Sequence, residues 1–183
     1  MKTIELQLSN GEIGVVKVDD EDFATLSQYK WHGSRCRSHD YYVARMVVGG
    51  SVLMHRQIMG AKKGDVVDHI NHDTLDNRRD NLRICTTAQN AYNQKPTGVT
   101  SKHKGVCRGT NPNKPWQVRI RANGKRLFLG AFASEEEAAE AYREASLRLH
   151  GEYSYFSSVP EALKVSSERV LTGCGVDLRE VMG

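Results

Sequence analysis

The sequence predicts an α+β protein built from two small modules, and three observations support this prediction. Residues 64–95 read as a strand, a polar loop, a second strand and a helix. Residues 116–149 read as a hairpin followed by an amphipathic helix. Between them, Pro96 and Gly98 interrupt both periodicities. A chain of 183 residues has room for one ordinary domain or two small ones. Its composition, with 39% hydrophobic and 26% charged residues, favours small modules with large solvent-exposed surfaces.

The first 63 residues carry two hairpin signals and two helix signals. Asn10-Gly11 and Gly49-Gly50 each separate two runs with the alternation of half-buried strands. Phe23 and Leu26 recur at helical spacing after an acidic helix start. The expected strands are residues 3–8, 13–18, 41–48 and 51–54, and the expected helices start at residues 19–22 and span 55–59.

The most informative stretch is VVDHINHDTLDNRRDNLRICTTAQNAYN, residues 66–93. Asp68 and His69 close a short β-branched run, and a helix opened by Thr86 or Thr87 follows the second apolar run. This order allows Asp68, His69 and a helical Asn to converge on one point. Carboxylate and amide oxygens suit a hard cation, and a His of near-neutral pKa suits a general base. The stretch therefore indicates a hydrolytic site.

This segment resembles the HNH nuclease motif, the ββα-metal finger, in the variant whose third letter is Asn. The resemblance implies that Asp68 and Asn90 bind the metal and that His69 is the general base. It also implies that Asn81 ties the intervening loop to the strands. Asn90 follows Asn81 at a distance that agrees with the family's spacing. The implied cofactor is Mg²⁺ or Mn²⁺.

Strand geometry restricts how the first two of these residues can meet. Consecutive residues on a regular strand point to opposite faces, so Asp68 and His69 share a site only if the strand ends or kinks there. The polar loop at 70–80 allows this. Nearby arginines are expected to contact phosphates; they are Arg78, Arg79 and Arg83. His55, in MHRQIMG, is expected to have a packing and hydrogen-bonding role.

The second half of the chain is basic. Residues 101–133 contain eight Lys or Arg and no Asp or Glu, which indicates a surface that faces a polyanion. Asn123-Gly124 predicts a type I′ turn, and that turn sets the register of the hairpin. The expected pairs are Ala122–Lys125, Arg121–Arg126, Ile120–Leu127, Arg119–Phe128 and Val118–Leu129. One face is then arginine-rich, and the other is apolar and needs a helix to cover it.

Residues 102–156 resemble the AP2 DNA-binding domain, a three-stranded sheet packed on one helix. The matching pieces are HKGV, WQVRIR, KRLFLGAF and SEEEAAEAYREAS, the last of which begins with a capping box at Ser134. The sequence departs from the plant pattern at Cys107 and Arg119, so the target sequence does not carry over. The implied DNA contacts are Lys104, Arg108, Arg119, Arg121, Arg126 and Phe128.

Together the two resemblances predict an HNH nuclease domain at residues 1–95, with its finger at 64–95, and an AP2-like domain at 102–156. A linker at 96–101 and a tail at 157–183, with a candidate helix, complete the chain. This order matches free-standing homing-type endonucleases of phage and intron-borne elements. The predicted function is a site-selective endonuclease acting on double-stranded DNA. Two alternatives remain open: a non-cutting DNA-binding regulator with a relic finger, and an RNA-binding accessory protein.

Two other classes of protein are disfavoured. The four cysteines form no C-x-x-C pair, which argues against a structural zinc site and for free thiols in a reducing compartment. The N-terminus has no apolar signal region, and no run of 18 apolar residues occurs. We expect a soluble, cytoplasmic protein without membrane partners.

Overall fold

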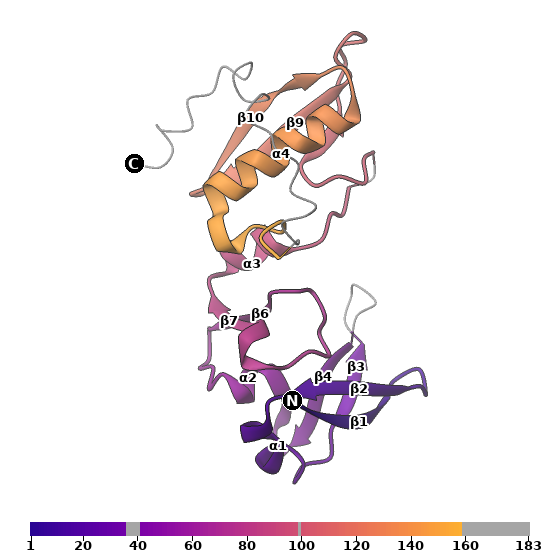
Figure 1. Ribbon diagram of the computed structural model, residues 1–183, viewed down its shortest axis with the longest axis vertical. Coiled ribbons are helices and arrows are strands. Elements are labelled where there is room, and N and C mark those ends of the chain that lie inside the picture. Colours follow the sequence, from indigo (N-terminus) through magenta and orange to yellow (C-terminus); the bar gives the residue numbers. More distant parts are fainter. Residues whose placement is uncertain (36–40, 99, 159–183) are drawn as a thin grey trace. The chain divides into compact units, whose positions relative to one another are not determined.

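The computed structural model describes residues 1–35, 41–98 and 100–158, and it confirms the α+β fold (Figure 1). The chain has two compact units, Met1–Asn90 and a second that starts at Ala91. The division falls inside the helix α3 (Thr87–Asn93) rather than in the expected linker at 96–101. In the described part of the chain, no helix combines the length and apolar character needed to cross a membrane.

A five-stranded sheet, of order β2-β1-β3-β4-β5, forms the body of the first unit. Four strands agree with the sequence prediction to within one residue; they are β1 (Lys2–Leu8), β2 (Ile13–Val18), β4 (Tyr41–Val47) and β5 (Gly50–Leu53). The strand β3 (His32–Arg35) was not predicted. It pairs parallel with β1 and antiparallel with β4. Its sequence, HGSR, has no β-branched residue to signal a strand.

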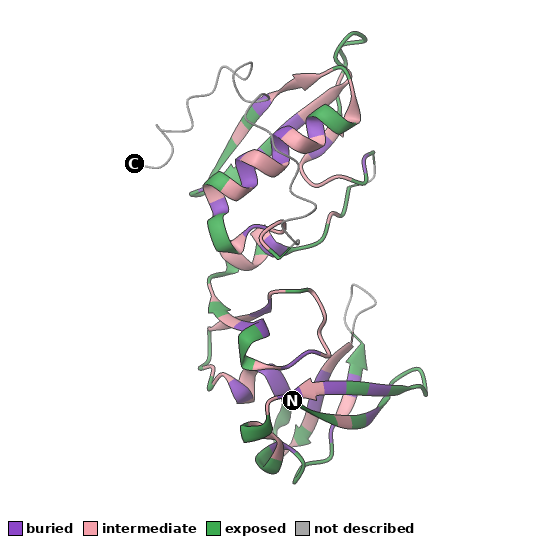
Figure 2. Cartoon of the chain, viewed as in Figure 1, coloured by how far each residue is buried: buried purple, intermediate pink, exposed green. Residues whose placement is uncertain are grey.

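One hydrophobic core joins this sheet to the short helices and to the finger. The helices α1 (Asp20–Leu26) and α2 (Met54–Ile58) bury Leu26 and Met54 against the strands. Along β2, buried and exposed residues alternate, as expected of a half-buried strand (Figure 2). The finger contributes Leu82 to the same core.

The finger is a separate two-stranded sheet of β6 (Val66–His69) and β7 (Leu82–Cys85). A loop and the short 3-10 turn η1 (Arg79–Asn81) connect them. Main-chain hydrogen bonds fasten this loop to β2: Lys17 N donates to Leu75 O at 2.9 Å, and Asn77 N donates to Lys17 O at 2.8 Å. The N-terminal sheet therefore supports the finger loop directly.

The second unit contains the predicted three-stranded sheet, of order β10-β9-β8. Its strands are β8 (Val106–Arg108), β9 (Trp116–Ala122) and β10 (Lys125–Phe132). The first four predicted pairs of the hairpin are confirmed, and both turn residues have positive φ, 48° at Asn123 and 75° at Gly124. The fifth pair is wrong. A β-bulge after Phe128 makes Val118 pair with Gly130, while Leu129 stays buried in the core.

The helix α4 (Glu135–His150) covers the apolar face of this sheet (Figure 1). Ser134 caps it, because its side chain accepts a hydrogen bond from Glu137 N. Ala138, Ala141 and Ala145 are completely buried, and such small side chains allow helix and sheet to approach closely. The short turn η2 (Gly151–Tyr153) follows. The candidate tail helix lies outside the described residues, which include only 157 and 158 of the tail.

Candidate active site

The β6–β7 ladder places Asp68 and His69 at the end of a strand. Asp68 pairs with Arg83 and His69 with Leu82, and β6 ends at His69. Both side chains are buried. Asp68 accepts from the Arg83 guanidinium, whereas His69 contacts Asn77 and two other rings. Because β6 ends at His69, the strand stops at this pair, which is the condition under which the two side chains can share a site.

Asn77 fixes the tautomer of His69. The Nδ2 of Asn77 donates to Thr74 O at 3.2 Å, so its Oδ1 is the atom that faces His69 Nε2, at 3.4 Å. An amide oxygen only accepts hydrogen bonds, so Nε2 must carry the proton. In a neutral imidazole Nδ1 then holds the basic lone pair. Asn77 is completely buried, which prevents the amide from turning away.

Two more rings surround His69. The His55 ring on α2 lies edge-on to it with ring centroids 5.1 Å apart, and Tyr42 on β4 lies 6.1 Å away. Burial lowers the pKa of His69 below its ordinary value, against the opposing effects of Asn77 and nearby carboxylates. Burial, with His69 and Arg56 close by, lowers the pKa of His55 to about 3. His55 is therefore neutral near pH 7, and the His69 imidazole is biased toward the neutral, basic form.

Asn81 ties the finger loop together. Its Oδ1 accepts from Asn71 N at 3.0 Å, and its Nδ2 donates to Asp76 O at 2.7 Å. Its main-chain oxygen accepts from Ile70 N at 2.9 Å. The side chain is buried, so these bonds replace lost hydration. Asn81 thus positions the loop that follows His69.

Asp68 and Asn90 carry the oxygen donors that a hard divalent cation prefers. Asp68 is a buried carboxylate that pairs with Arg83, with Nη2 to Oδ2 at 2.7 Å. Asn90 lies half-buried on α3 and carries an amide oxygen. Carboxylate and amide oxygens, completed by water and phosphate, are typical of Mg²⁺ sites. Within the described residues, no cluster of three His, Cys, Asp or Glu forms a metal site.

A capping box starts the helix that carries Asn90. Gln89 N donates to Thr86 Oγ1 at 3.2 Å, and Thr86 N donates to Gln89 Oε1 at 2.8 Å. Of the two expected helix starts, Thr86 is therefore the N-cap. The cap fixes the first turn of α3, from which Asn90 projects after the second strand of the finger.

The second unit presents the expected arginine face. Four residues on the side of the sheet not covered by α4 are exposed: Arg119, Arg121, Arg126 and Phe128. Arg108 does not share this face. It pairs across strands with Trp116, and its guanidinium lies 5.0 Å from the centre of that ring. Trp116 packs against the core that α4 covers, so Arg108 lies at the edge of the opposite face.

Four other predicted phosphate or DNA contacts already have partners within the protein. Arg79 donates to the Asp22 carboxylate at 2.9 and 2.7 Å. Lys104 Nζ donates to the main-chain oxygens of Ala91, Tyr92 and Gln94, at 3.1, 2.8 and 2.5 Å. Arg83 pairs with Asp68. Arg78 makes a two-pronged contact with the buried Asp76, at 2.7 and 2.6 Å. A DNA phosphate would have to share these groups or displace their partners.

The C-terminal half of α3 belongs to the second unit because of specific contacts. Tyr92 stacks on His150 with ring centroids 3.7 Å apart and an interplanar angle of 4°. Tyr155 N donates to Tyr92 O at 3.2 Å, and Lys104 binds the carbonyl end of the helix. A fragment that begins near residue 99 would lack these contacts. An isolated second unit therefore needs α3 as well.

Sequence reasoning missed Asn77 and Tyr42. Asn77 lies inside the quoted stretch, but a polar loop residue carries no local sign that it will be buried. Tyr42 lies 27 positions before His69, and only the packing of β4 beside the finger brings the two rings together. The signal for His55 was present in the His-Arg pair on α2, and the predicted packing role agrees with its ring contacts. The predicted hydrogen-bonding role is not seen at its Nδ1, which is buried without a hydrogen-bond partner among the described residues.

Comparison with known proteins shows that one protein family matches the part of the chain that contains this site. The model of a family described as HNH endonuclease matches residues 52–92, which include α2, the finger and most of α3. No solved structure matches the chain with significance.

Two viral proteins and a set of plant proteins are similar to the chain. An uncharacterized HNH endonuclease of Acanthamoeba polyphaga mimivirus is 29% identical over 153 residues, 80% of this chain and 76% of that protein. Protein 3.8 of Escherichia phage T7 is 32% identical over 95 residues, 51% of this chain and 77% of that protein. An AP2-like ethylene-responsive transcription factor of Arabidopsis thaliana is 47% identical over 53 residues, 28% of this chain but only 10% of the plant protein.

Proposed function

The chain belongs to the HNH endonuclease family, and on this premise we propose that it is a site-selective endonuclease cutting double-stranded DNA. Family membership makes it a metal-dependent nuclease. The observation that carries the proposal is the orientation of His69. Asn77 Oδ1 faces Nε2, and we therefore assign Nδ1 as the nitrogen that acts as the base at the end of β6.

His69 acts as the general base of hydrolysis. Its Nδ1 accepts a proton from water, and the water oxygen attacks the phosphorus. The bond from phosphorus to the 3′ oxygen breaks, and the 3′ oxygen takes a proton from solvent water, which leaves 5′-phosphate and 3′-hydroxyl ends. Asn77 keeps Nε2 protonated while His55 and Tyr42 restrict the ring. Asn81 holds the loop that frames this base.

Asp68 and Asn90 would hold the cation. When bound there, Mg²⁺ or Mn²⁺ would supply charge neutralisation at the phosphate and stabilise the leaving 3′ oxygen. Arg83 pairs with Asp68 and supplies a positive group next to this carboxylate. Arg78 at the loop surface supplies a second positive group.

The second unit docks the duplex. Like charges on one sheet face destabilise it unless an anionic partner meets them, and Arg121 lies directly opposite Arg126. A two-stranded β-ribbon fits the major groove, where arginine pairs with guanine. The surface that would contact the DNA bases consists of Arg119, Arg121, Arg126 and the half-exposed Phe128. The similarity to plant AP2-like transcription factors supports the assignment.

Incubation with supercoiled plasmid tests this function against its rivals. The proposed enzyme converts the plasmid to nicked or linear forms with Mg²⁺ and leaves it intact in excess EDTA. A DNA-binding regulator with a relic finger retards the plasmid without cutting it. An RNA-binding accessory protein prefers single strands and shows no metal-dependent cleavage.

A further inference from the structure

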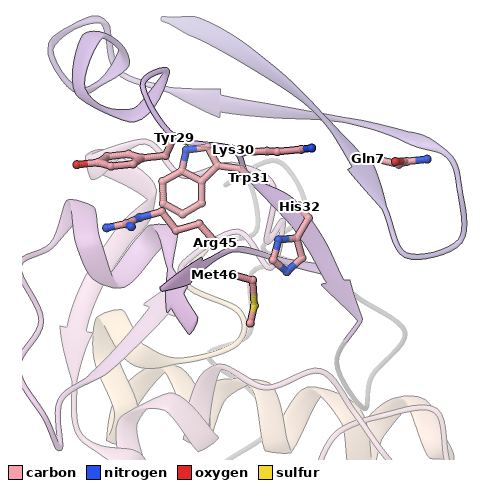
Figure 3. A pocket seen from close by; sticks show the side chains of 7 residues that line it. All are labelled: Gln7, Tyr29, Lys30, Trp31, His32, Arg45 and Met46. Atoms are coloured by element: carbon pink, nitrogen blue, oxygen red, sulfur yellow. The ribbon is translucent and has the colours of Figure 1, made fainter. Parts of the chain in front are cut away.

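A hollow on the first unit lies outside the finger and has no role in the mechanism above. Its volume is about 420 Å³, within the ~300–1,000 Å³ of typical ligand pockets. It is lined by Gln7, Tyr29, Lys30, Trp31, His32, Arg45 and Met46 (Figure 3). The segment joining α1 to β3 supplies the aromatic wall, and β4 supplies Arg45 and Met46.

Arg45 is held in this hollow by stacking rather than by an ion pair. Its guanidinium lies 4.1 Å from the centre of the Tyr29 ring and 5.8 Å from that of Trp31. Gln57 accepts from its Nε at 3.1 Å, which orients the plane. Among the described residues, Arg45 has no carboxylate partner. Figure 3 shows the Arg45 guanidinium beside the Tyr29 ring. The Trp31 ring lies between this pair and His32.

The lining combines positive charge with apolar and aromatic surface. Lys30 and Arg45 are basic, and no Asp or Glu lines the hollow in the described part of the chain. Tyr29 is 38% exposed and Met46 71% exposed, so both offer surface to a ligand. Aromatic rings that stack bases and cations that bind phosphates are the two elements of single-strand nucleic-acid sites.

The hollow and the active site share two structural elements. β4 carries Tyr42, whose ring lies beside His69, and Arg45, which lines the hollow. α2 carries His55, whose ring also lies beside His69, and Gln57, which accepts a hydrogen bond from Arg45. Three residues of strand separate Tyr42 from Arg45, and this odd spacing directs the two side chains to opposite faces of β4.

We propose that this hollow binds one unpaired nucleotide of the DNA substrate, with its base on Tyr29 and its phosphate on Arg45 and Lys30. The inference rests on the proposed function, because the ligand is taken to be part of the substrate. The hollow then favours substrates in which the duplex is frayed, gapped or carries a single-stranded tail.

Binding in excess EDTA tests this proposal without interference from cutting. Fluorescence anisotropy of the full chain is measured with a blunt labelled duplex and with the same duplex carrying a tail of three thymidines. Wild type is expected to bind the tailed duplex about tenfold more tightly, since stacking of a single base is substantial. Tyr29→Ala reduces this preference at least about fivefold. Tyr29→Phe keeps it, because the ring remains.

Arg45→Ala is expected to remove the same preference, and Lys63→Ala, an exposed basic control outside the hollow, is expected to keep it. Thermal unfolding checks each variant. If Arg45→Ala fails to fold, the Tyr29 pair decides alone. Equal binding of blunt and tailed duplexes by wild type overturns the proposal, as does an equal loss in Lys63→Ala. Competition by free thymidine monophosphate as strong as that by a tailed duplex also overturns it.

Cutting is assayed separately on plasmid, which distinguishes the two claims. Metal-dependent cutting without a tail preference refutes the hollow and leaves the proposed function standing. A tail preference lost in Tyr29→Ala, in a protein that never cuts, supports the hollow and refutes the nuclease assignment.

Discussion

Asn77 holds the Nε2 of His69 from 3.4 Å, and its own Nδ2 is fixed by the main-chain oxygen of Thr74. This contact gives the buried His69 a defined tautomer. The support extends further, because Asn77 N donates to Lys17 O on β2. Residues near the start of the chain thus help to set the protonation geometry of the site.

Asn77→Ala is expected to lower kcat about 10–100-fold, the usual cost of removing a group that orients a histidine. KM should change little, because Asn77 is buried away from any substrate. Asn77→Asp keeps an acceptor for Nε2–H and should retain more activity than Asn77→Ala. Steady-state cleavage of a labelled duplex measures both. Equal activity of Asn77→Ala and wild type would refute the orienting role.

Asp68→Asn and Asn90→Ala are expected to act through the metal. Each removes or weakens an oxygen donor, so the Mg²⁺ concentration for half-maximal cutting should rise about 10–100-fold. Asp80→Asn, at an exposed loop carboxylate, is the matched control and should leave that concentration unchanged. Cleavage rates across a Mg²⁺ titration give the answer. Unshifted titrations in both site variants would contradict the ligand assignment.

Replacement of Arg119, Arg121 and Arg126 by Ala should weaken DNA binding and alter its salt dependence. If all three contact phosphates, the slope of log K against log salt should flatten by about 2.7, at ~0.9 per phosphate. If they read bases, the slope should hold and sequence preference should be lost. Arg148→Ala, exposed on α4, serves as the control. A triple variant that binds the same sites as tightly as wild type would exclude this sheet as the reading surface.

His150 is expected to make the stability of the second unit depend on pH. Burial, the largest effect, lowers its pKa below 6.5, and Lys104 adds to the shift against an opposing hydrogen bond to Arg121 O. As the pH falls, His150 therefore takes up a proton in the unfolded chain at a higher pH than in the folded chain. The contribution of neutral His150 to the stability of the fold is complete above about pH 6.5. It declines as the pH falls from 6.5 to the lower pKa that His150 has in the folded chain.

Urea unfolding of wild type and His150→Gln at pH 7.5 and 5.0 measures this effect. The advantage of wild type over the variant should be larger at pH 7.5, because other titrating groups cancel in the difference. An advantage of the same size at both pH values would show that His150 titrates alike in the folded and unfolded chain.

The features predictable from sequence are those set by local chemistry. Asn123-Gly124 specifies a type I′ turn because both positions need positive φ, and the turn then fixes four cross-strand pairs. Ser134 starts α4 because its hydroxyl satisfies a free main-chain N–H. The placement of Asp68 and His69 at the end of a strand follows from the same kind of local pattern.

The features that escaped prediction depend on distant contacts. The strand β3 exists because β1 and β4 both pair with it, although HGSR has little strand propensity. The bulge after Phe128 depends on how Leu129 packs, which turn chemistry does not specify. The orientation of His69 depends on Asn77, and Asn77 depends on Lys17, 60 residues earlier. Such relationships become visible only when the chain is folded.

The cutting activity of His69→Ala tests the central claim most directly. A general base contributes roughly 10²–10⁴-fold in rate and little to docking. With Mg²⁺ at saturation, the variant should therefore cut plasmid at least about 100-fold more slowly than wild type, while its affinity for duplex DNA in EDTA is unchanged. Retention of more than about a tenth of the wild-type rate under the same conditions would contradict the assignment of His69 as the base.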